Sequence, residues 1–149
     1  MTPDRLEHPR LGVLRWDDEH HWFAGRHRDC RVNLDPFTNF VPSQRPHELP
    51  DAEAFVDGCA ERIEAVLDAY PVLAAHVAGD LLALYNEDWQ DGEPIDPGEF
   101  VLRLSLDAIT VDADFRCEVF LDDGDLFAGH AIIVDVDADG SLGRVQLFG

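Results

Sequence analysis

Lysine is absent from this chain of 149 residues, and all 11 basic residues are arginines. Acidic residues number 31, which makes the net charge −20 with histidine neutral. The charge is uneven, because residues 1–50 hold seven arginines and eight acids while residues 51–149 hold four arginines and 23 acids. Such a field repels nucleic acid and anionic membranes and attracts cationic partners, although acidic surfaces also serve solubility alone. We therefore expect neither a nucleic-acid-binding nor a membrane protein.

The chain also lacks a long apolar run and a cationic leader followed by an apolar segment. These absences argue against bilayer insertion and a secretory signal, and they favour a cytoplasmic protein. The three cysteines, Cys30, Cys59 and Cys117, form no CxxC pair and lie within apolar patterns. Buried, reduced thiols are the expected state.

Recognisable catalytic motifs are missing as well. The sequence contains no GxSxG, no HExxH and no glycine-rich phosphate loop before a helix, so we expect no cofactor. The remaining arrangement that could support acid–base chemistry pairs His130 with Asp122, Asp123 or Asp125 in the preceding turn. The alternative is a core histidine that is hydrogen-bonded to the backbone or to a carboxylate.

Two groups of strands are predicted at the ends of the chain. Residues 115–149 form three apolar runs separated by Asp/Gly turns at 122–124 and 139–140, which is typical of an antiparallel meander. A strand at 106–111 precedes them. Shorter apolar runs at 12–16, 21–26 and 30–34 predict a second, N-terminal meander.

Helices are predicted between these groups. A proline-rich loop at 35–50 leads to an amphipathic helix from an N-cap at Asp51 to about Tyr70, where Pro71 ends it. A second helix spans about 72–89, and Asp96 starts a short helix that runs to about Leu104.

The predicted fold is therefore α+β in one domain, 1–149. An antiparallel sheet is built from the N-terminal and C-terminal meanders, and the two central helices pack on one face. Each amphipathic element has one apolar side, which it can bury only against another element.

One side of the first helix carries five acids: Glu53, Asp57, Glu61, Glu64 and Asp68. They form either a solvated face or a surface that binds a basic protein partner.

A possible metal site lies near the C-terminus. Asp135, Asp137, Asp139 and Gly140 match the first half of a calcium loop, whose carboxylates alternate before a glycine turn. The twelfth position is Gln146, which removes the bidentate glutamate, and strands flank the segment. A turn with outward-facing acids and a weak calcium site are the two interpretations.

Several short motifs resemble a family of small bacterial domains of unknown function. They are His8-Pro9 with Gly12, Leu84-Tyr85-Asn86 with Trp89, Glu99-Phe100, and Asp123-Gly124 followed by Phe127 and Gly129-His130. Such small acidic families look like immunity partners of toxins, and the resemblance implies no catalytic residue. We therefore expect an acidic binding protein that engages a basic protein, with an immunity protein as the most concrete form. The alternatives are an enzyme that uses His130 and a weak calcium-binding domain.

Overall fold

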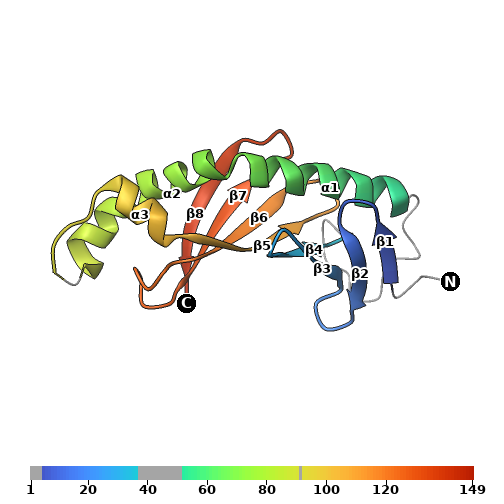
Figure 1. Ribbon diagram of the computed structural model, residues 1–149, viewed down its shortest axis with the longest axis horizontal. Helices are drawn as coiled ribbons and strands as arrows, with labels where there is room; N and C mark the ends of the chain where they lie inside the picture. Colours follow the sequence, from blue (N-terminus) through green and yellow to red (C-terminus); the bar gives the residue numbers. More distant parts are fainter. Residues whose placement is uncertain (1–4, 37–51, 91) are drawn as a thin grey trace.

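A computed structural model shows one eight-stranded sheet in which the spatial order of the strands is their order in the chain (Figure 1). The structure describes residues 5–36, 52–90 and 92–149. Within these ranges three α-helices and one π-helical turn accompany the sheet, so the mixed α+β class is confirmed. The predicted N-cap Asp51 and positions 37–50 of the predicted loop lie outside the described residues.

The N-terminal strands form an antiparallel meander. Its members are β1 (Arg5–His8), β2 (Gly12–Asp17), β3 (Trp22–His27) and β4 (Cys30–Leu34). The β3–β4 turn consists of Arg28 and Asp29, both with positive φ, which is the geometry that matches the twist of a two-residue hairpin. The sequence analysis missed β1, because four residues are too few for a clear alternation.

The C-terminal strands form the second antiparallel meander. They are β5 (Ser105–Val111), β6 (Cys117–Asp122), β7 (Ala131–Val136) and β8 (Leu142–Phe148). On β6, Cys117, Val119 and Leu121 are buried, whereas Glu118 and Asp122 are exposed, as the alternation predicts. His130 lies immediately before β7, which begins at Ala131.

A single parallel pair joins the two meanders. Val32 of β4 lies opposite Ile109 of β5, and Leu34 lies opposite Val111. The expectation of an antiparallel sheet is therefore wrong at this pair, although it holds at the other six. Parallel neighbours need a long crossover, and the chain between β4 and β5 carries the described helices.

The helices are α1 (Ala52–Asp68), α2 (Tyr70–Leu84), the π-helical turn η2 (Tyr85–Trp89) and α3 (Pro97–Arg103). Pro71 lies in the first turn of α2 instead of ending the preceding helix. Proline is tolerated there because the N–H groups of the first turn have no acceptor within the helix, so the missing N–H costs no hydrogen bond. The predicted second helix continues beyond Leu84 only as η2, which ends with a bond from the Gln90 N–H to the Tyr85 carbonyl. Asp96 caps α3 as predicted, since its Oδ1 accepts the Glu99 N–H at 2.8 Å.

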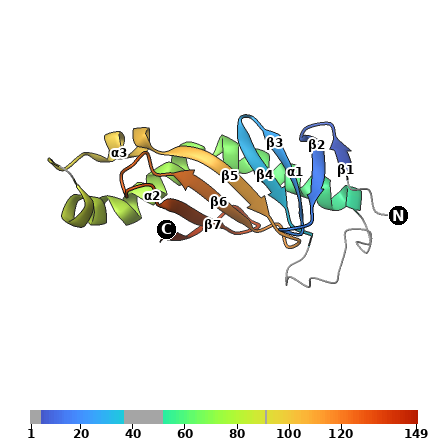
Figure 2. The same cartoon turned by 90° about the horizontal axis from the view of Figure 1, so that it is seen from below.

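Both long helices run along the same side of the sheet (Figures 1 and 2). α1 contacts β4 and β5, and α2 contacts β8. Ile63 and Val77 from the helices share one buried cluster with Ile109, Val119 and Val134 from the strands. Among the described residues, no single helix is long and apolar enough to cross a membrane; only Glu53–Asp68 with Tyr70–Trp89, bent by 66°, reaches that length and composition as a pair.

The cysteines are free and buried, as expected. Burial raises the pKa of Cys30 and of Cys117 to about 11, and it raises the pKa of Cys59 as well. All three side chains are therefore neutral thiols that pack as small apolar groups.

Two turn glycines allow a steric test of the β6–β7 connection. Gly124 and Gly140 both have positive φ, but an added Cβ at Gly124 would lie 2.2 Å from the Arg103 carbonyl oxygen, whereas at Gly140 it would meet nothing within 4 Å. We expect Gly140→Ala to cost about 1 kcal/mol of unfolding free energy through backbone strain alone. Gly124→Ala should cost about 2 kcal/mol more, because backbone cannot easily move aside. Urea unfolding measures both, and equal losses would contradict this packing of the turn against α3.

Candidate functional site

The turn that carries Asp122, Asp123 and Asp125 is held together by its own carboxylates. Asp123 is only 2% exposed. Its Oδ2 accepts the N–H groups of Phe127 at 2.8 Å and Gly129 at 3.0 Å, and its Oδ1 accepts that of Asp125 at 3.0 Å. The carboxylate of Asp122 accepts the Gly124 N–H at 2.8 Å. These acids organise the turn backbone.

His130 lies at the end of the same turn. Its Nδ1 donates to the carbonyl oxygen of Phe127, and its ring packs edge-to-face on Trp89 with centroids 5.4 Å apart. Among the described residues, no hydrogen bond joins His130 to Asp122, Asp123 or Asp125. The structure thus places the predicted acid–base residues in one turn without forming a carboxylate–imidazole pair.

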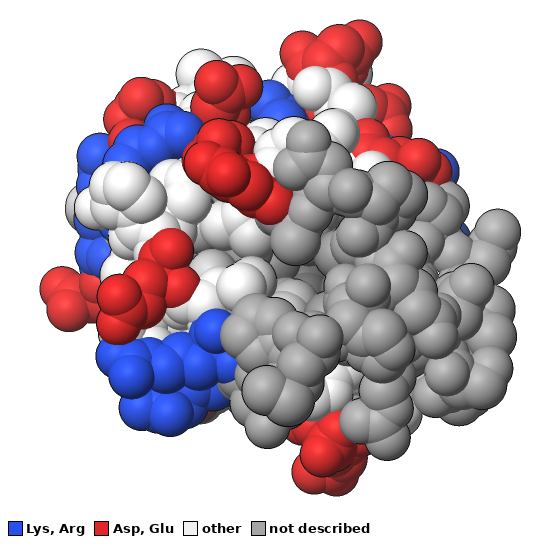
Figure 3. All heavy atoms as spheres, turned by 90° about the vertical axis from the view of Figure 1, so that its right-hand side faces the viewer, with Lys and Arg blue, Asp and Glu red and all other residues white. Residues whose placement is uncertain are grey.

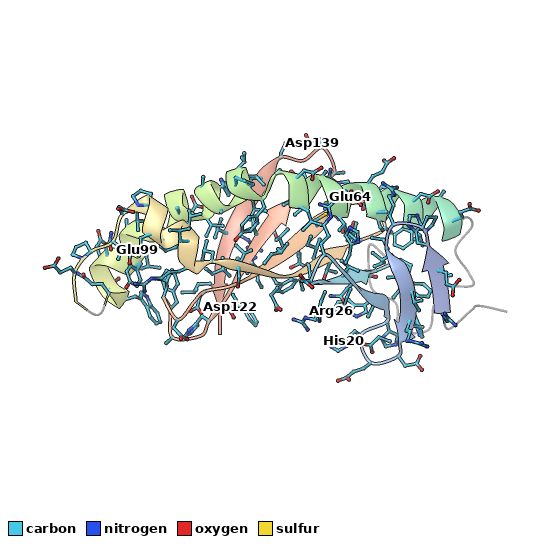
Figure 4. The ribbon with its side chains drawn as sticks, viewed as in Figure 1. His20, Arg26, Glu64, Glu99, Asp122 and Asp139 are labelled. Atoms are coloured by element: carbon cyan, nitrogen blue, oxygen red, sulfur yellow. The ribbon has the colours of Figure 1, made fainter. Side chains whose placement is uncertain are left out.

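The segment Asp135 to Gly140 ends β7 and makes the turn into β8. Gly140 N–H donates to the Asp137 carbonyl at 2.8 Å, and Asp139 accepts the Ser141 N–H at 2.9 Å. Hydrogen bonds from Ser141 lower the pKa of Asp139. Asp139 is far from Asp122, at the opposite end of the C-terminal strands (Figure 4). In the part of the chain that the structure describes, no three His, Cys, Asp or Glu side chains are grouped as metal ligands.

Three of the five α1 acids, Asp57, Glu64 and Asp68, contact the N-terminal meander. Asp57 accepts the Nε2 proton of His8 at 2.7 Å. Glu64 lies 3.3 Å from both His27 and Arg28. These contacts cross between helix and sheet, so part of the predicted docking surface stabilises the fold.

Asp68 lies 3.7 Å from Arg28, which also contacts Glu64. Glu53 and Glu61 remain exposed and form no ion pair with a described residue. They are the α1 carboxylates that stay available to a partner.

An acidic pocket of about 420 Å³ lies over β5, β6 and β7, at the end of these strands that carries the β5–β6 turn. It was not predicted from the sequence. Its lining includes five carboxylates and two arginines: Asp35, Asp112, Glu118, Asp135, Asp137, Arg116 and Arg144. The cross-strand register creates this group, because Glu118 lies opposite Thr110 on one side and Asp135 on the other. Like charges directly opposite each other repel, so the two acids form an unfavourable pair.

The pocket side chains are held by short local contacts. Asp112 begins the β5–β6 turn, where its Oδ1 accepts the N–H groups of Asp114 at 2.8 Å and Arg116 at 3.1 Å. Its Oδ2 lies 3.4 Å from the Arg116 guanidinium. On the other side of the pocket, Arg144 of β8 lies 3.7 Å from Asp135.

The electrostatics of the pocket centre on Glu118. Desolvation by the pocket walls and the nearby charges of Asp135 and Asp112 raise the pKa of Glu118, and Arg144 partly opposes this. A group that ionises reluctantly in this setting favours a cation as a neighbour. A guanidinium or ammonium group nearby would favour the ionised form of Glu118.

Residues 8–147 match a family described as an uncharacterized protein conserved in bacteria (DUF2262). The chain belongs to this family. The matched range includes the acidic pocket and the His130 turn. No curated protein and no solved structure matches the chain.

The short motifs on which the resemblance was based have structural contacts in the described chain. His8 binds Asp57, and the Asn86 amide both donates to and accepts from the backbone of Ile95. Trp89 packs edge-to-face on Phe127 with centroids 5.5 Å apart. These contacts join the helix end, the loop before α3 and the β6–β7 turn, so the motifs maintain the architecture.

The buried carboxylate of Asp123 generates a stability prediction. In Asp123→Asn an amide NH₂ replaces one acceptor oxygen and faces backbone N–H donors, so we expect a loss of about 3 kcal/mol in unfolding free energy. Asp122→Asn is the matched control, because its one accepted bond uses Oδ1, which asparagine retains. The control should lose less than about 0.5 kcal/mol in urea unfolding. Equal losses would show that the buried network does not hold the turn.

Glu118 generates a prediction about pH. Its pKa is higher in the folded than in the unfolded chain, so the folded state binds the proton more tightly and loses stability as the carboxyl ionises. Glu118→Gln should therefore raise the melting temperature at about pH 7, and the gain should vanish below about pH 4, where glutamate is protonated in both states.

Glu61→Gln is the control for Glu118→Gln, because it removes one negative charge from an exposed site in the middle of α1. Differential scanning calorimetry across this pH range compares the two variants. A gain from Glu61→Gln as large as that from Glu118→Gln would assign the effect to net charge instead of the pocket.

Proposed function

We propose that this chain is a non-enzymatic, cytoplasmic binding protein, acting as one domain, that engages a basic protein partner through the acidic pocket. Neutralisation of a basic toxin, as by an immunity protein, is the most concrete form of this role. The observation that carries the proposal is the convergence of five carboxylates on one pocket. The three buried free thiols favour the reducing cytoplasm.

The pocket suits a single basic side chain. A volume of about 420 Å³ accommodates an arginine or lysine side chain inserted from a partner. A guanidinium placed between Glu118 and Asp135 would relieve their repulsion and could make two parallel hydrogen bonds to a carboxylate. Arginine is also among the residues that most often dominate binding energy at interfaces.

The charge of the rest of the chain favours the approach of a basic partner protein. Residues 51–149 carry 23 acids against four arginines, which attracts a cationic protein over distances of about a Debye length, ~10 Å in 0.1 M salt. Such steering mainly accelerates association, while the buried contacts in the pocket determine how long the complex lasts.

The contacts of Asp123 argue against catalysis by that carboxylate. Asp123 already accepts three backbone N–H groups. A general base needs a free oxygen or nitrogen directed at a substrate proton. The Nδ1–H of His130 donates to the Phe127 carbonyl, so His130 could act as a base only through Nε2, and no carboxylate in the described part of the chain orients its ring.

A pull-down with charge-matched variants tests the proposal. The full chain is immobilised and exposed to native cytoplasm at about 50 and about 300 mM salt, on either side of physiological ionic strength. We expect wild type to retain a basic protein at low salt and release it at high salt. Glu118→Gln with Asp135→Asn should weaken binding of that protein, once purified, by about tenfold or more, because a charge-assisted contact is lost.

The control is Glu53→Gln with Glu61→Gln, which removes the same charge from the exposed side of α1 and should change affinity less than about threefold. Isothermal titration calorimetry compares the two double variants. A larger loss in the α1 variant would place the partner on the helix. Recovery of no basic protein at low salt would leave solubility as the role of the charge.

A further inference from the structure

A second pocket, of about 560 Å³, lies over β2, β3, β4 and β5. Its polar lining is basic, in contrast to the net charge of the chain, and consists of Arg15, Arg26, Arg31, His20, Asn33, Thr110 and Asp17. Figure 4 shows Arg26 and His20 below the sheet, on the side away from α1 and Glu64. The pocket therefore opens on the sheet face that the long helices leave uncovered.

The register of the strands forms the hollow. Arg26 lies opposite Arg31, and Arg31 lies opposite Ala108. In the neighbouring row, Arg15 lies opposite Ala24. Successive strand residues alternate between faces, so these side chains all lie on the open face. The short side chains of Ala24 and Ala108 form the floor of the pocket, and the longer arginines stand beside them.

The arginines are incompletely neutralised. Arg26 and Arg31 are a like-charged cross-strand pair, an arrangement that is unfavourable without a counter-ion. Arg31 binds Asp107 at 2.7 Å. Arg26 donates to the Asp29 carbonyl at 3.3 Å and forms no ion pair with a residue in the described ranges. Arg15 forms no ion pair with any residue that the structure describes.

Acids near the pocket offset only part of this charge. Asp17 is held by His20 at 2.8 Å, and that bond lowers the pKa of Asp17, so its carboxylate stays ionised. With Asp107 bound to Arg31, two acids face the three arginines of the lining. Figure 3 shows arginines interspersed with acids at the end of the molecule near β1 and β2.

The pocket also offers apolar contacts. Trp22 lies in its wall, stacked on His20 with centroids 4.8 Å apart and rings 7° from parallel. Phe120 lies beyond Ala108 on the opposite side. Ligand pockets commonly combine such apolar walls with a few fixed charged groups.

We infer that this pocket binds a small organic anion, whose phosphate or carboxylate contacts Arg26 and Arg31 and whose apolar body lies over Ala24 and Ala108. Arginine suits this role because its planar donors match an oxyanion in pairs. The inference goes beyond the proposed partner binding and uses a different pocket.

Titration of the full chain with four probes tests this inference. The probes are phenyl phosphate, benzoate, inorganic phosphate and phenol, followed by amide NMR shifts and calorimetry at low salt. We expect saturable binding of phenyl phosphate or benzoate with shifts around Arg26 and Arg31. Their relative affinity distinguishes a phosphate from a carboxylate ligand. Inorganic phosphate should bind more weakly because it lacks the apolar ring, and phenol should bind more weakly because it lacks the anionic group.

Arg26→Gln should weaken binding of the preferred probe by about tenfold or more, because one charge-assisted contact is lost. Arg103→Gln is the matched control, as it removes the same charge from α3, where Arg103 pairs with Glu99, and it should change affinity less than about threefold. Arg15→Gln provides a second pocket variant if Arg26→Gln fails to fold. Glu118→Gln should leave probe binding intact, which separates this site from the acidic pocket.

Two results would overturn the inference. One is the absence of saturable binding by both phenyl phosphate and benzoate at millimolar concentrations. The other is an equal loss of affinity in Arg26→Gln and Arg103→Gln, which would indicate a general charge effect.

Discussion

The parallel pairing of β4 with β5 is the constraint on which the rest of the structure depends. It joins two antiparallel meanders into one sheet, through opposite pairs such as Val32 with Ile109. Parallel neighbours cannot be connected by a tight turn, so the chain must cross over before it returns. The long helices lie in that crossover and run along one side of the sheet (Figure 1). One pairing therefore accounts for the position of the long helices, between the two meanders in the chain and against the sheet in space.

The open face separates charge along the sheet. Arginines gather over β2, β3 and β4, and carboxylates gather where β5, β6 and β7 meet, with Thr110 lining both pockets. Each pocket contains a like-charged cross-strand pair, Arg26 with Arg31 and Glu118 with Asp135. Such pairs reduce stability and are stabilised by a counter-charge, which Asp107 supplies to Arg31 and Arg144 to Asp135.

The short motifs on which the family resemblance rests and the residues of the pockets are different sets. His8, Asn86, Trp89 and Asp123 join elements through hydrogen bonds and ring contacts. Their contacts stabilise the fold of this chain, whereas the pockets take their charged side chains from the open face of the sheet.

Local patterns determined much of the fold from the sequence. Alternation along β6, the Asp96 cap of α3 and the acidic turns indicated strands and helices close to their observed positions. Errors occurred where a signal was ambiguous. Pro71 fits either the end of one helix or the first turn of the next, and the four residues of β1 are too short to show a period.

The predicted acid–base residues lie in and beside one turn, but their chemistry depends on atoms that a sequence does not place. Asp123 is a buried acceptor of backbone N–H groups, and His130 is bound to a backbone carbonyl. Proximity in sequence predicts that residues lie near each other, whereas the direction of each oxygen and nitrogen follows from the folded turn.

Composition by itself determined the charge of the chain and its lack of known catalytic motifs. Only the tertiary structure decided which charges meet. Glu118 and Asp135 are 17 positions apart, and Arg26 and Arg31 flank a turn, yet each pair is brought together by strand register. Register depends on burying the correct face of every strand at once, and a shift of one residue would turn each of these side chains to the other face. The sequence determines which charged residues are present, whereas the fold determines which of them lie together in a pocket.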